Sequence, residues 1–266
     1  MRAKIYQIDL QRDKQRTAFM SLSETYQANS QASIDAGIYD EVFNADVEPM
    51  SLEEMFTRFN TVMHPLYRGR SMSVSDVVVI DPEISADGVH DAFYSDQLSS
   101  AFDAPRLGTD GTPSKEPVPI AKAGAYFCNA IGFTSIAFDE SQTHKPDNML
   151  KVVYVEPNRK PFEAEILPDL KHLQQAVGGF IEPIYMDDGV IIVGNEEAKL
   201  QGMAGNRRLG KPILAGSLFI CGEADEDFRS LTPEETEKYM DRFAEPEQIS
   251  QQEVEADMGY TIISWY

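Results

Sequence analysis

Two polar triplets in the second half of the chain have residue types that could bind an anion. Asn195-Glu196-Glu197 follows a predicted strand, and Asn206-Arg207-Arg208 comes about ten residues later. The guanidinium forks of two adjacent arginines suit bidentate contacts with a phosphate or a carboxylate. The intervening GMAGNRRLG segment is not a P-loop, because it lacks the Gly-Lys-Ser/Thr ending. The alternative is a turn in which Asn and Glu cap a helix and Arg pairs locally. The candidate ligand-binding residues are Asn195, Glu196, Glu197, Asn206, Arg207 and Arg208.

The histidines and cysteines lack the spacing of metal ligands. None of the histidines forms an HExxH motif, and the two cysteines are far apart in the chain. Both cysteines lie inside apolar runs, which favours buried thiols in a reducing compartment. We therefore expect no metal and no cofactor. These residues are His64, His90, His144, His172, Cys128 and Cys221.

A serine nucleophile has little support in the sequence. Ser71, Ser73 and Ser75 lie near His64, and Asp76 follows, but there is no GxSxG elbow. Ser75 and Asp76 are better explained as side chains that satisfy backbone groups where a strand begins. We therefore expect no catalytic residues.

The charge of the chain is strongly negative. Its formal net charge is −21, and residues 222–266 contain 13 acidic and 3 basic residues. Such a surface repels nucleic-acid phosphates and anionic lipid, and it attracts basic protein surfaces. We therefore expect a protein partner with a basic surface, no direct nucleic-acid binding and no membrane binding. The densest acidic run is either a solvated loop or a contact for that partner. It consists of Glu223, Asp225, Glu226 and Asp227.

A second candidate contact lies in the polar segment 82–123. Its aromatic residues either anchor the segment on its own domain or are exposed anchors for a partner, surrounded by aspartates. Paired acids elsewhere carry less information, since Asp187-Asp188-Gly189 is typical of a hairpin turn. The candidate partner-binding residues of this segment are Asp91, Phe93, Tyr94, Asp96, Phe102 and Asp103.

These candidate residues must be positioned by a small set of predicted elements. In the first half, Ser51 and Glu54 form a capping box that begins a helix, and Pro65 excludes its continuation. Segment 82–123 is rich in Pro, Gly, Ser and Asp and is predicted to be an irregular insertion. Predicted strands are Lys4–Leu10, Ile38–Phe43, Val74–Ile80 and a pair within Ala125–Phe138.

The second half contains two predicted helices. The first has Leu167, Leu170, Leu173 and Val177 on one face and ends at Gly178. The second is capped by Thr232, ends near Phe243 and is followed by a solvated acidic stretch. Predicted strands are Leu150–Glu156, Phe180–Tyr185, Val190–Val193, Ile213–Cys221 and Tyr260–Tyr266.

These elements predict an α+β fold with two small domains, each a mixed or antiparallel sheet with one or two packed helices. The boundaries are 1–140, with the insertion at 82–123, a linker at 141–148, and 149–266 with an acidic C-terminal extension. No apolar stretch is long enough for a membrane span, and residues 1–16 show no export signal. We therefore expect a cytoplasmic protein.

Two parts of the chain are similar to known families. The run SLEEMFTRFN, then YRGRSMSVSDVVVID and AYFCNAIGFTSIAF, resembles the YodL-like domain of conjugative transposons and other mobile elements. Segment 82–123 departs from the family pattern, in which the last run follows soon after the SVSD strand. The later VGGFIE, NEEAKL and NR motifs resemble an uncharacterised domain family of phages, plasmids and integrative elements. The resemblances imply a mobile-element setting.

Together, these features predict a non-catalytic acidic binding protein of a mobile genetic element. Its specific form is an inhibitor of host defence, either anti-CRISPR or anti-restriction, that acts by DNA mimicry on a nuclease. One alternative is a small-ligand-binding or enzymatic domain that uses the Asn195–Arg208 region. Another is an accessory module of a conjugation machinery.

Overall fold

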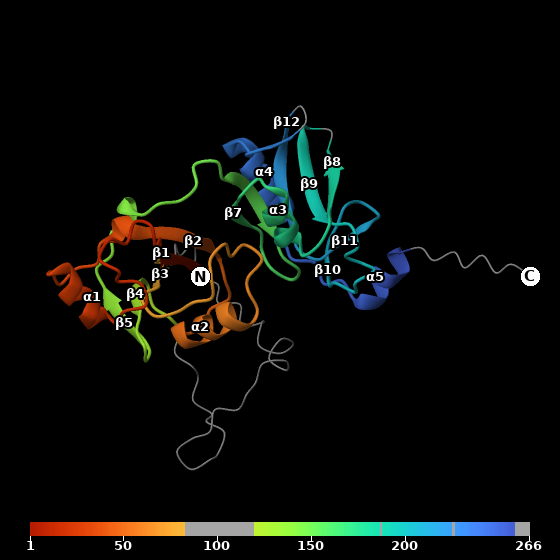
Figure 1. The fold of residues 1–266 in the computed structure, drawn as a ribbon. Helices are drawn as coiled ribbons and strands as arrows, with labels where there is room; N and C mark the ends of the chain where they lie inside the picture. Colours follow the sequence, from red (N-terminus) through yellow and green to blue (C-terminus); the bar gives the residue numbers. More distant parts are fainter. Residues whose placement is uncertain (83–119, 187, 225–226, 259–266) are drawn as a thin grey trace, which may run out of the picture.

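The computed structural model describes residues 1–82, 120–186, 188–224 and 227–258. It shows an α+β fold in two domains, each built on an antiparallel sheet with helices packed on its faces (Figure 1). The predicted fold class is thus confirmed. Most of segment 82–123, with its candidate partner-binding residues, and the predicted strand Tyr260–Tyr266 lie outside the described residues.

The first domain contains a five-stranded sheet with the order β2-β1-β3-β4-β5. Alternate residues of its strands enter different cores, as the two-residue period of a strand requires. Ile5 and Val78 belong to the core shared with the second domain, whereas Tyr6 and Val77 pack on the opposite face. Its elements are β1 (Arg2–Ile8), α1 (Leu22–Asn29), η1 (Ala36–Ile38), β2 (Tyr39–Asp46), α2 (Leu52–Thr61), β3 (Val77–Ile80), β4 (Gly124–Cys128), β5 (Phe133–Ile136) and η3 (Glu140–Gln142).

The second domain contains a sheet with the order β7-β6-β12-β9-β8, and β13 pairs with the end of β12. Helix α3 packs on the face directed toward the first domain, and α4 packs on the opposite face. The two-stranded ribbon β10–β11 and α5 surround a smaller core. The elements are β6 (Leu150–Val155), β7 (Phe162–Ile166), α3 (Leu170–Val177), β8 (Ile181–Tyr185), β9 (Val190–Asn195), β10 (Gly205–Arg208), β11 (Ile213–Ala215), β12 (Leu218–Ala224), β13 (Asp227–Arg229), α4 (Pro233–Arg242) and α5 (Gln251–Asp257).

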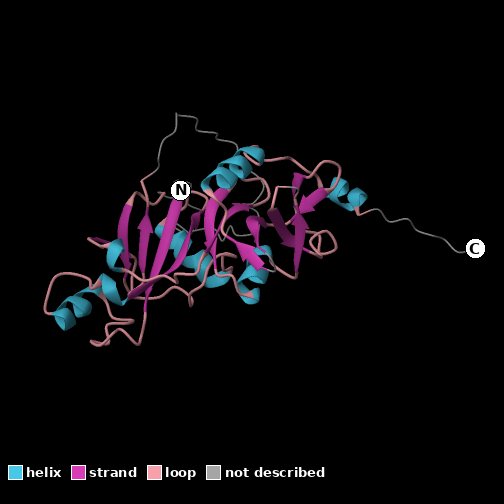
Figure 2. Ribbon diagram, turned by 90° about the horizontal axis from the view of Figure 1, so that it is seen from above, coloured by secondary structure: helices cyan, strands magenta, loops and turns pink. Residues whose placement is uncertain are grey.

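The two domains share one apolar core. Phe43 and Phe59 of the first domain belong to the same buried cluster as Tyr154 and Phe162 of the second. Strands β2 and β7 lie against each other there, and the view from above shows the two groups of strands side by side (Figure 2). The Arg2 guanidinium adds a polar contact by donating to the Glu163 carbonyl at 2.8 Å. Apolar burial, more than the connecting segment, holds the domains together.

Local capping signals agree with the structure. The Ser51 hydroxyl accepts from the Glu54 N–H at 3.1 Å, and the Glu54 carboxylate accepts from the Ser51 N–H at 2.8 Å. Thr232 and Glu235 form the same reciprocal pair at the start of α4. The capping box predicted at Ser51 and the cap predicted at Thr232 are both confirmed. Such pairs are predictable because each satisfies free helix N–H groups within a few residues.

Three predicted elements need correction. The strand expected at Ile213–Cys221 is two strands, because Gly216 between them has a φ of 71°. The stretch after α4 contains a further helix, α5, capped by Ser250. Helix α3 begins at Leu170, so Leu167 precedes it, and Leu170, expected on the buried face, is 59% exposed in the first turn.

None of the helices in the described part of the chain has the length and apolar content needed to cross a bilayer.

Candidate functional site

The first predicted triplet lies in the turn after β9. The Asn195 side chain donates to the Gly178 carbonyl at 3.1 Å and accepts from the Glu197 N–H at 2.8 Å. It therefore ties this turn to the end of α3. The side chains of Glu196 and Glu197 are exposed. Asn195 thus caps and links elements, as the turn alternative expects.

The second triplet is partly interior. Asn206 is fully buried and donates to the carbonyls of Val155 and Gly216 at 2.9 and 2.7 Å. Arg207 is 1% exposed, and its guanidinium donates to the carbonyls of Arg159 at 2.7 Å and Phe243 at 3.0 Å. This corrects the expected placement of Arg207 in an open anion site, because its donors face main-chain carbonyls inside the domain.

Arg208 points outward and binds carboxylates of its own chain. Its guanidinium contacts Glu247 at 2.8 Å and Glu253 at 2.7 Å, which ties β10 to the segment that leads into α5. Four of the six predicted ligand-binding residues therefore serve separate structural tasks, and the side chains of the other two, Glu196 and Glu197, are exposed. A concave pocket that gathers Glu196, Glu197, Asn206 and Arg207 is not supported by this geometry.

The two ends of the acidic run lie on paired strands, Glu223 on β12 and Asp227 on β13. Glu223 pairs with Phe228 and Ala224 with Asp227 across β12 and β13, and Glu223 and Asp227 are exposed. Between them, Asp225 and Glu226 lie outside the described residues. We call the paired strands β12 and β13 the β12–β13 hairpin, and its described carboxylates are exposed to solvent.

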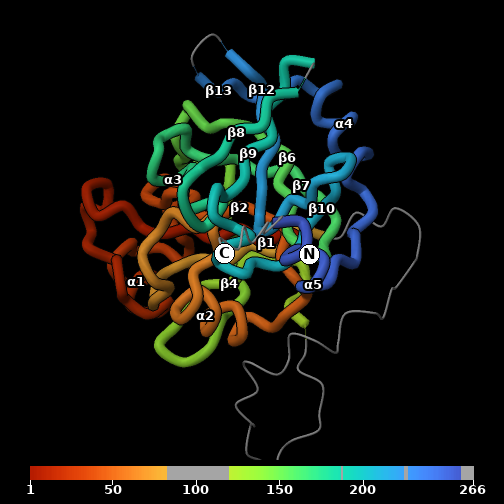
Figure 3. The backbone as a smooth tube through the Cα atoms, turned by 90° about the vertical axis from the view of Figure 1, so that its right-hand side faces the viewer, coloured from red at the N-terminus to blue at the C-terminus, as the bar shows by residue number. Residues whose placement is uncertain are grey.

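Helix α4 lies beside this hairpin (Figure 3), and Arg229 joins the two. The Arg229 guanidinium binds the Glu235 carboxylate at 2.7 and 2.8 Å, and this hydrogen bonding lowers the pKa of Glu235 to about 2. Gly222 makes the contact possible, because a Cβ there would lie 2.3 Å from the Arg229 guanidinium. Arg229 is therefore paired with a carboxylate of its own domain.

The outer surface of α4 carries a stripe of carboxylates. Glu234, Glu237 and Asp241 are all exposed and are spaced three and four residues apart, which places them on one side of a helix. The two cations of α4 are directed elsewhere. Lys238 binds Asp188 at 2.6 Å, and Arg242 lies over the Tyr239 ring at 5.6 Å. We call Glu234, Glu237 and Asp241 the α4 stripe; in the described part of the chain, none of them has an ion-pair partner.

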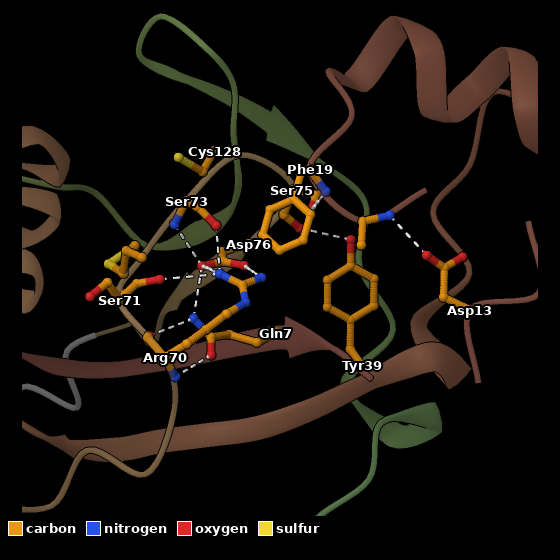
Figure 4. A network of polar contacts seen from close by, with 12 residues as sticks. Gln7, Asp13, Phe19, Tyr39, Arg70, Ser71, Ser73, Ser75, Asp76 and Cys128 are labelled. Carbon is orange, nitrogen blue, oxygen red and sulfur yellow. Dashed lines mark hydrogen bonds and ion pairs between the residues drawn. The ribbon is translucent and has the colours of Figure 1, made fainter. Parts of the chain in front are cut away.

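A polar network occupies the first domain at the YRGRSMSVSD run (Figure 4). Asp76 is fully buried and accepts from Arg70 at 2.6 Å, from Gln7 at 2.9 Å and from the Ser73 N–H at 2.8 Å. Burial raises the pKa of Asp76, an effect that Arg70 opposes. The contacts converge on the carboxylate, and the network fixes the loop that leads into β3.

The backbone of Ser75, in the same loop, has an unusual conformation that its neighbours hold in place. Its φ is 76°, a conformation that L-residues rarely adopt. The Ser75 hydroxyl accepts from the Phe19 N–H at 2.9 Å, and the Tyr39 hydroxyl donates to the Ser75 carbonyl at 2.9 Å. The expectation that Ser75 and Asp76 satisfy backbone groups is confirmed. Cys128 nearby is buried, which raises the pKa of its thiol to about 12.

A groove of about 420 Å³ lies where the two domains meet. One wall comes from the loop after α2 and the other from α3. Sequence reasoning did not find it, because the two walls are about a hundred residues apart and neither contains a recognisable spacing. The lining residues are Met63, His64, Pro65, Tyr67, Arg68, Gly69, Lys171, His172, Gln175 and Gly178.

On the wall of this groove, His64 faces a carboxylate of the other domain. Its Nδ1 accepts from the Leu66 N–H at 3.1 Å, so its proton is on Nε2, which lies 3.6 Å from Glu156 and has no hydrogen-bond partner. Burial and the charge of Arg159 lower the pKa of His64 to about 3. Glu156 has a raised pKa, chiefly because it is buried. His64 is therefore neutral in the folded protein.

The described residues contain no group of three or more His, Cys, Asp or Glu side chains that could hold a metal ion.

Comparisons with known proteins give two family matches. The model of the YodL-like domain matches residues 2–102, and the model of a domain of unknown function, DUF3846, matches residues 150–244. No curated protein and no solved structure matches the chain. The chain thus contains a YodL-like domain followed by a DUF3846 domain, in the order that its motifs predict.

Proposed function

We propose that this protein is a non-catalytic binding protein whose acidic surface recognises a basic surface on a protein partner. The observation that carries the proposal is the α4 stripe beside the β12–β13 hairpin. In the described part of the chain its carboxylates form no ion pair: Arg229 binds Glu235, Lys238 binds Asp188, and Arg242, itself exposed, lies over the Tyr239 ring.

The position of the α4 stripe suits a contact surface. Helix α4 covers the face of the second sheet that is opposite to α3, so its outer side is directed away from the first domain. Exposed carboxylates at regular helical spacing produce a local negative potential that steers a basic partner. Since exposed charges are screened by salt, the association should weaken as ionic strength rises.

The finer form of this proposal concerns the partner. The basic surface is the nucleic-acid channel of a host defence nuclease, and the carboxylates occupy the positions of phosphates. The family resemblances to mobile-element proteins motivate this form. It places the protein in the cytoplasm and gives it a role in protecting a mobile element.

The test compares two variants with the same net charge. The stripe variant carries Glu234→Gln, Glu237→Gln and Asp241→Asn. The control variant carries Glu53→Gln, Glu182→Gln and Glu196→Gln, which are exposed carboxylates on other elements. Each protein is immobilised, partners are retained from a cell lysate at low salt, and the retained proteins are identified by mass spectrometry.

The expected result is a partner that is retained by the wild type and the control variant and is released by salt. The stripe variant should bind this partner about tenfold more weakly. Equal retention by the stripe and control variants would contradict a role for α4. For the finer form, the purified partner should be a nuclease whose DNA competes with the protein; simultaneous binding of both would exclude mimicry.

A further inference from the structure

The groove between the domains differs in charge from the rest of this acidic chain. Its lining residues include Arg68, Lys171 and two histidines, and no Asp or Glu is among them, although the chain has 44 acidic residues. Its volume of about 420 Å³ lies within the range of small-molecule sites. The lining of the groove therefore has basic side chains and no carboxylate, while Glu41 and Asp169 pair with Arg68 and His172 from outside the lining.

The cationic groups of the groove have different roles. The Arg68 side chain is only 9% exposed and is held by Glu41, since its guanidinium donates to the Glu41 carbonyl at 2.8 Å and lies 3.6 Å from the carboxylate. Lys171 is exposed and has no ion-pair partner in the described part of the chain. Lys171 is thus the cation of the groove that is left for a ligand.

His172 is the second side chain with donor capacity there. Its Nδ1 lies 2.6 Å from Asp169, which also caps α3, so the ring is held at one edge and Nε2 remains for another partner. When the ring carries a proton on each nitrogen, Nε2–H is a donor. Lys171 and His172 are neighbours near the start of α3, where the helix dipole adds positive potential.

The walls of the groove are held in place by contacts that a ligand need not displace. Gln175 donates to the Tyr67 carbonyl at 2.7 Å and joins the two walls directly. Gly69 lies so close to the sheet that a Cβ there would be 2.4 Å from the Gln7 side chain. A preformed site loses less entropy on binding than one that must be ordered.

We propose that this groove binds one small anionic molecule through a carboxylate or phosphate group, with Lys171 and His172 as the recognising side chains. The ligand would touch both domains, because Tyr67 and Gly69 line one wall and Lys171 and His172 the other. The site is separate from the α4 stripe, since α3 and α4 lie on opposite faces of the second sheet.

The experiment measures anion binding to the full chain by isothermal titration calorimetry. The probes are inorganic phosphate and pyrophosphate in one arm and succinate and citrate in the other, which distinguishes the two ligand chemistries. The wild type should bind at least one probe saturably with a stoichiometry of one. Because the protein has a net charge of −21, such binding requires a local cationic site.

Variants then locate the site. Lys171→Gln should weaken binding about tenfold or more, His172→Gln should also weaken it, and Lys171→Arg should retain it. The matched control is Lys160→Gln, which removes an exposed lysine on the β6–β7 turn and should bind as the wild type does. The proposal is overturned if no probe binds saturably to the wild type. It is equally overturned if Lys171→Gln binds like the wild type, or if Lys160→Gln loses as much affinity.

Discussion

His64 shows how a single buried side chain can link stability to pH. In the folded protein its imidazole is enclosed at the domain boundary, opposite Glu156, and cannot easily accept a proton. In the unfolded chain the same ring titrates with an ordinary pKa of about 6.5. The neutral ring therefore favours the folded state above that pH.

The first prediction at this scale follows from the sign of the shift. Because the folded pKa is depressed to about 3, the contribution of His64 is fully present above pH 6.5 and is lost as pH falls toward 3. Between pH 7 and pH 4 the loss is about 3 kcal/mol of unfolding free energy. Urea unfolding of the wild type and of His64→Gln at both pH values should show a smaller drop for the variant.

Glu156 must be considered in this comparison. Its raised pKa stabilises the folded state as pH falls, which opposes the effect of the histidine. The difference between wild type and His64→Gln isolates the histidine, since Glu156 is present in both. Equal drops in the two proteins would mean that His64 does not resist protonation.

At the scale of elements, the boundary between β11 and β12 depends on a glycine. Gly216 has a positive φ, and a Cβ at this position would lie 2.6 Å from the Met203 sulfur. Gly189 has a similar φ of 74°, but a Cβ there would have no heavy atom within 4 Å. A comparison of the two glycines therefore distinguishes the cost of backbone strain, present at both, from the cost of a steric clash, present only at Gly216.

The corresponding prediction compares two alanine variants. Gly189→Ala should cost about 1 kcal/mol, because only the conformation is strained. Gly216→Ala should cost roughly 1–3 kcal/mol more, since Met203 must also move out of its packed position. Urea unfolding measures both, and equal losses would show that Met203 can make room.

Signals that act within a few residues were predictable from the sequence. The Ser51–Glu54 box and the stop of α3 at Gly178 need only neighbouring backbone groups, and both are present in the structure. Helix α5 was missed although Ser250 and Glu253 form the same kind of box, because the acidic composition of the stretch suggested solvation.

Arrangements that depend on distant residues were not predictable. The carbonyls that bind Arg207 belong to residues 48 and 36 positions away. The sequence suggests that Arg207 and Arg208 could bind an anion together, whereas Arg207 in fact holds buried main-chain segments in place. The groove is another case, because its walls come from different domains. No local spacing can show that HPLYRG and DLKHLQQ face each other.

At the scale of the whole molecule, the shared core predicts that the domains depend on each other. Separation would expose Phe43, Phe59, Tyr154 and Phe162 to water, at a cost of about 25 cal/mol per Å² of apolar surface. We expect the full chain to unfold in one cooperative transition. Chains of residues 1–148 and 149–266, produced separately, should lack dispersed amide signals in NMR spectra.

The control for this prediction is the mixture of the two chains. Mixing should restore dispersed signals if the apolar contact is the missing part. Well-dispersed spectra for each chain alone would instead show that the domains fold independently and that their contact is dispensable.

Gly222 is uncharged, but it affects the arrangement of charged side chains around it. Because it has no side chain, the Arg229 guanidinium can lie across the strand and reach Glu235. A methyl group at this position would overlap the Arg229 side chain, which would have to shift and weaken its contact with Glu235. The electrostatic potential at this end of the molecule therefore depends on a residue that contributes nothing to the formal charge.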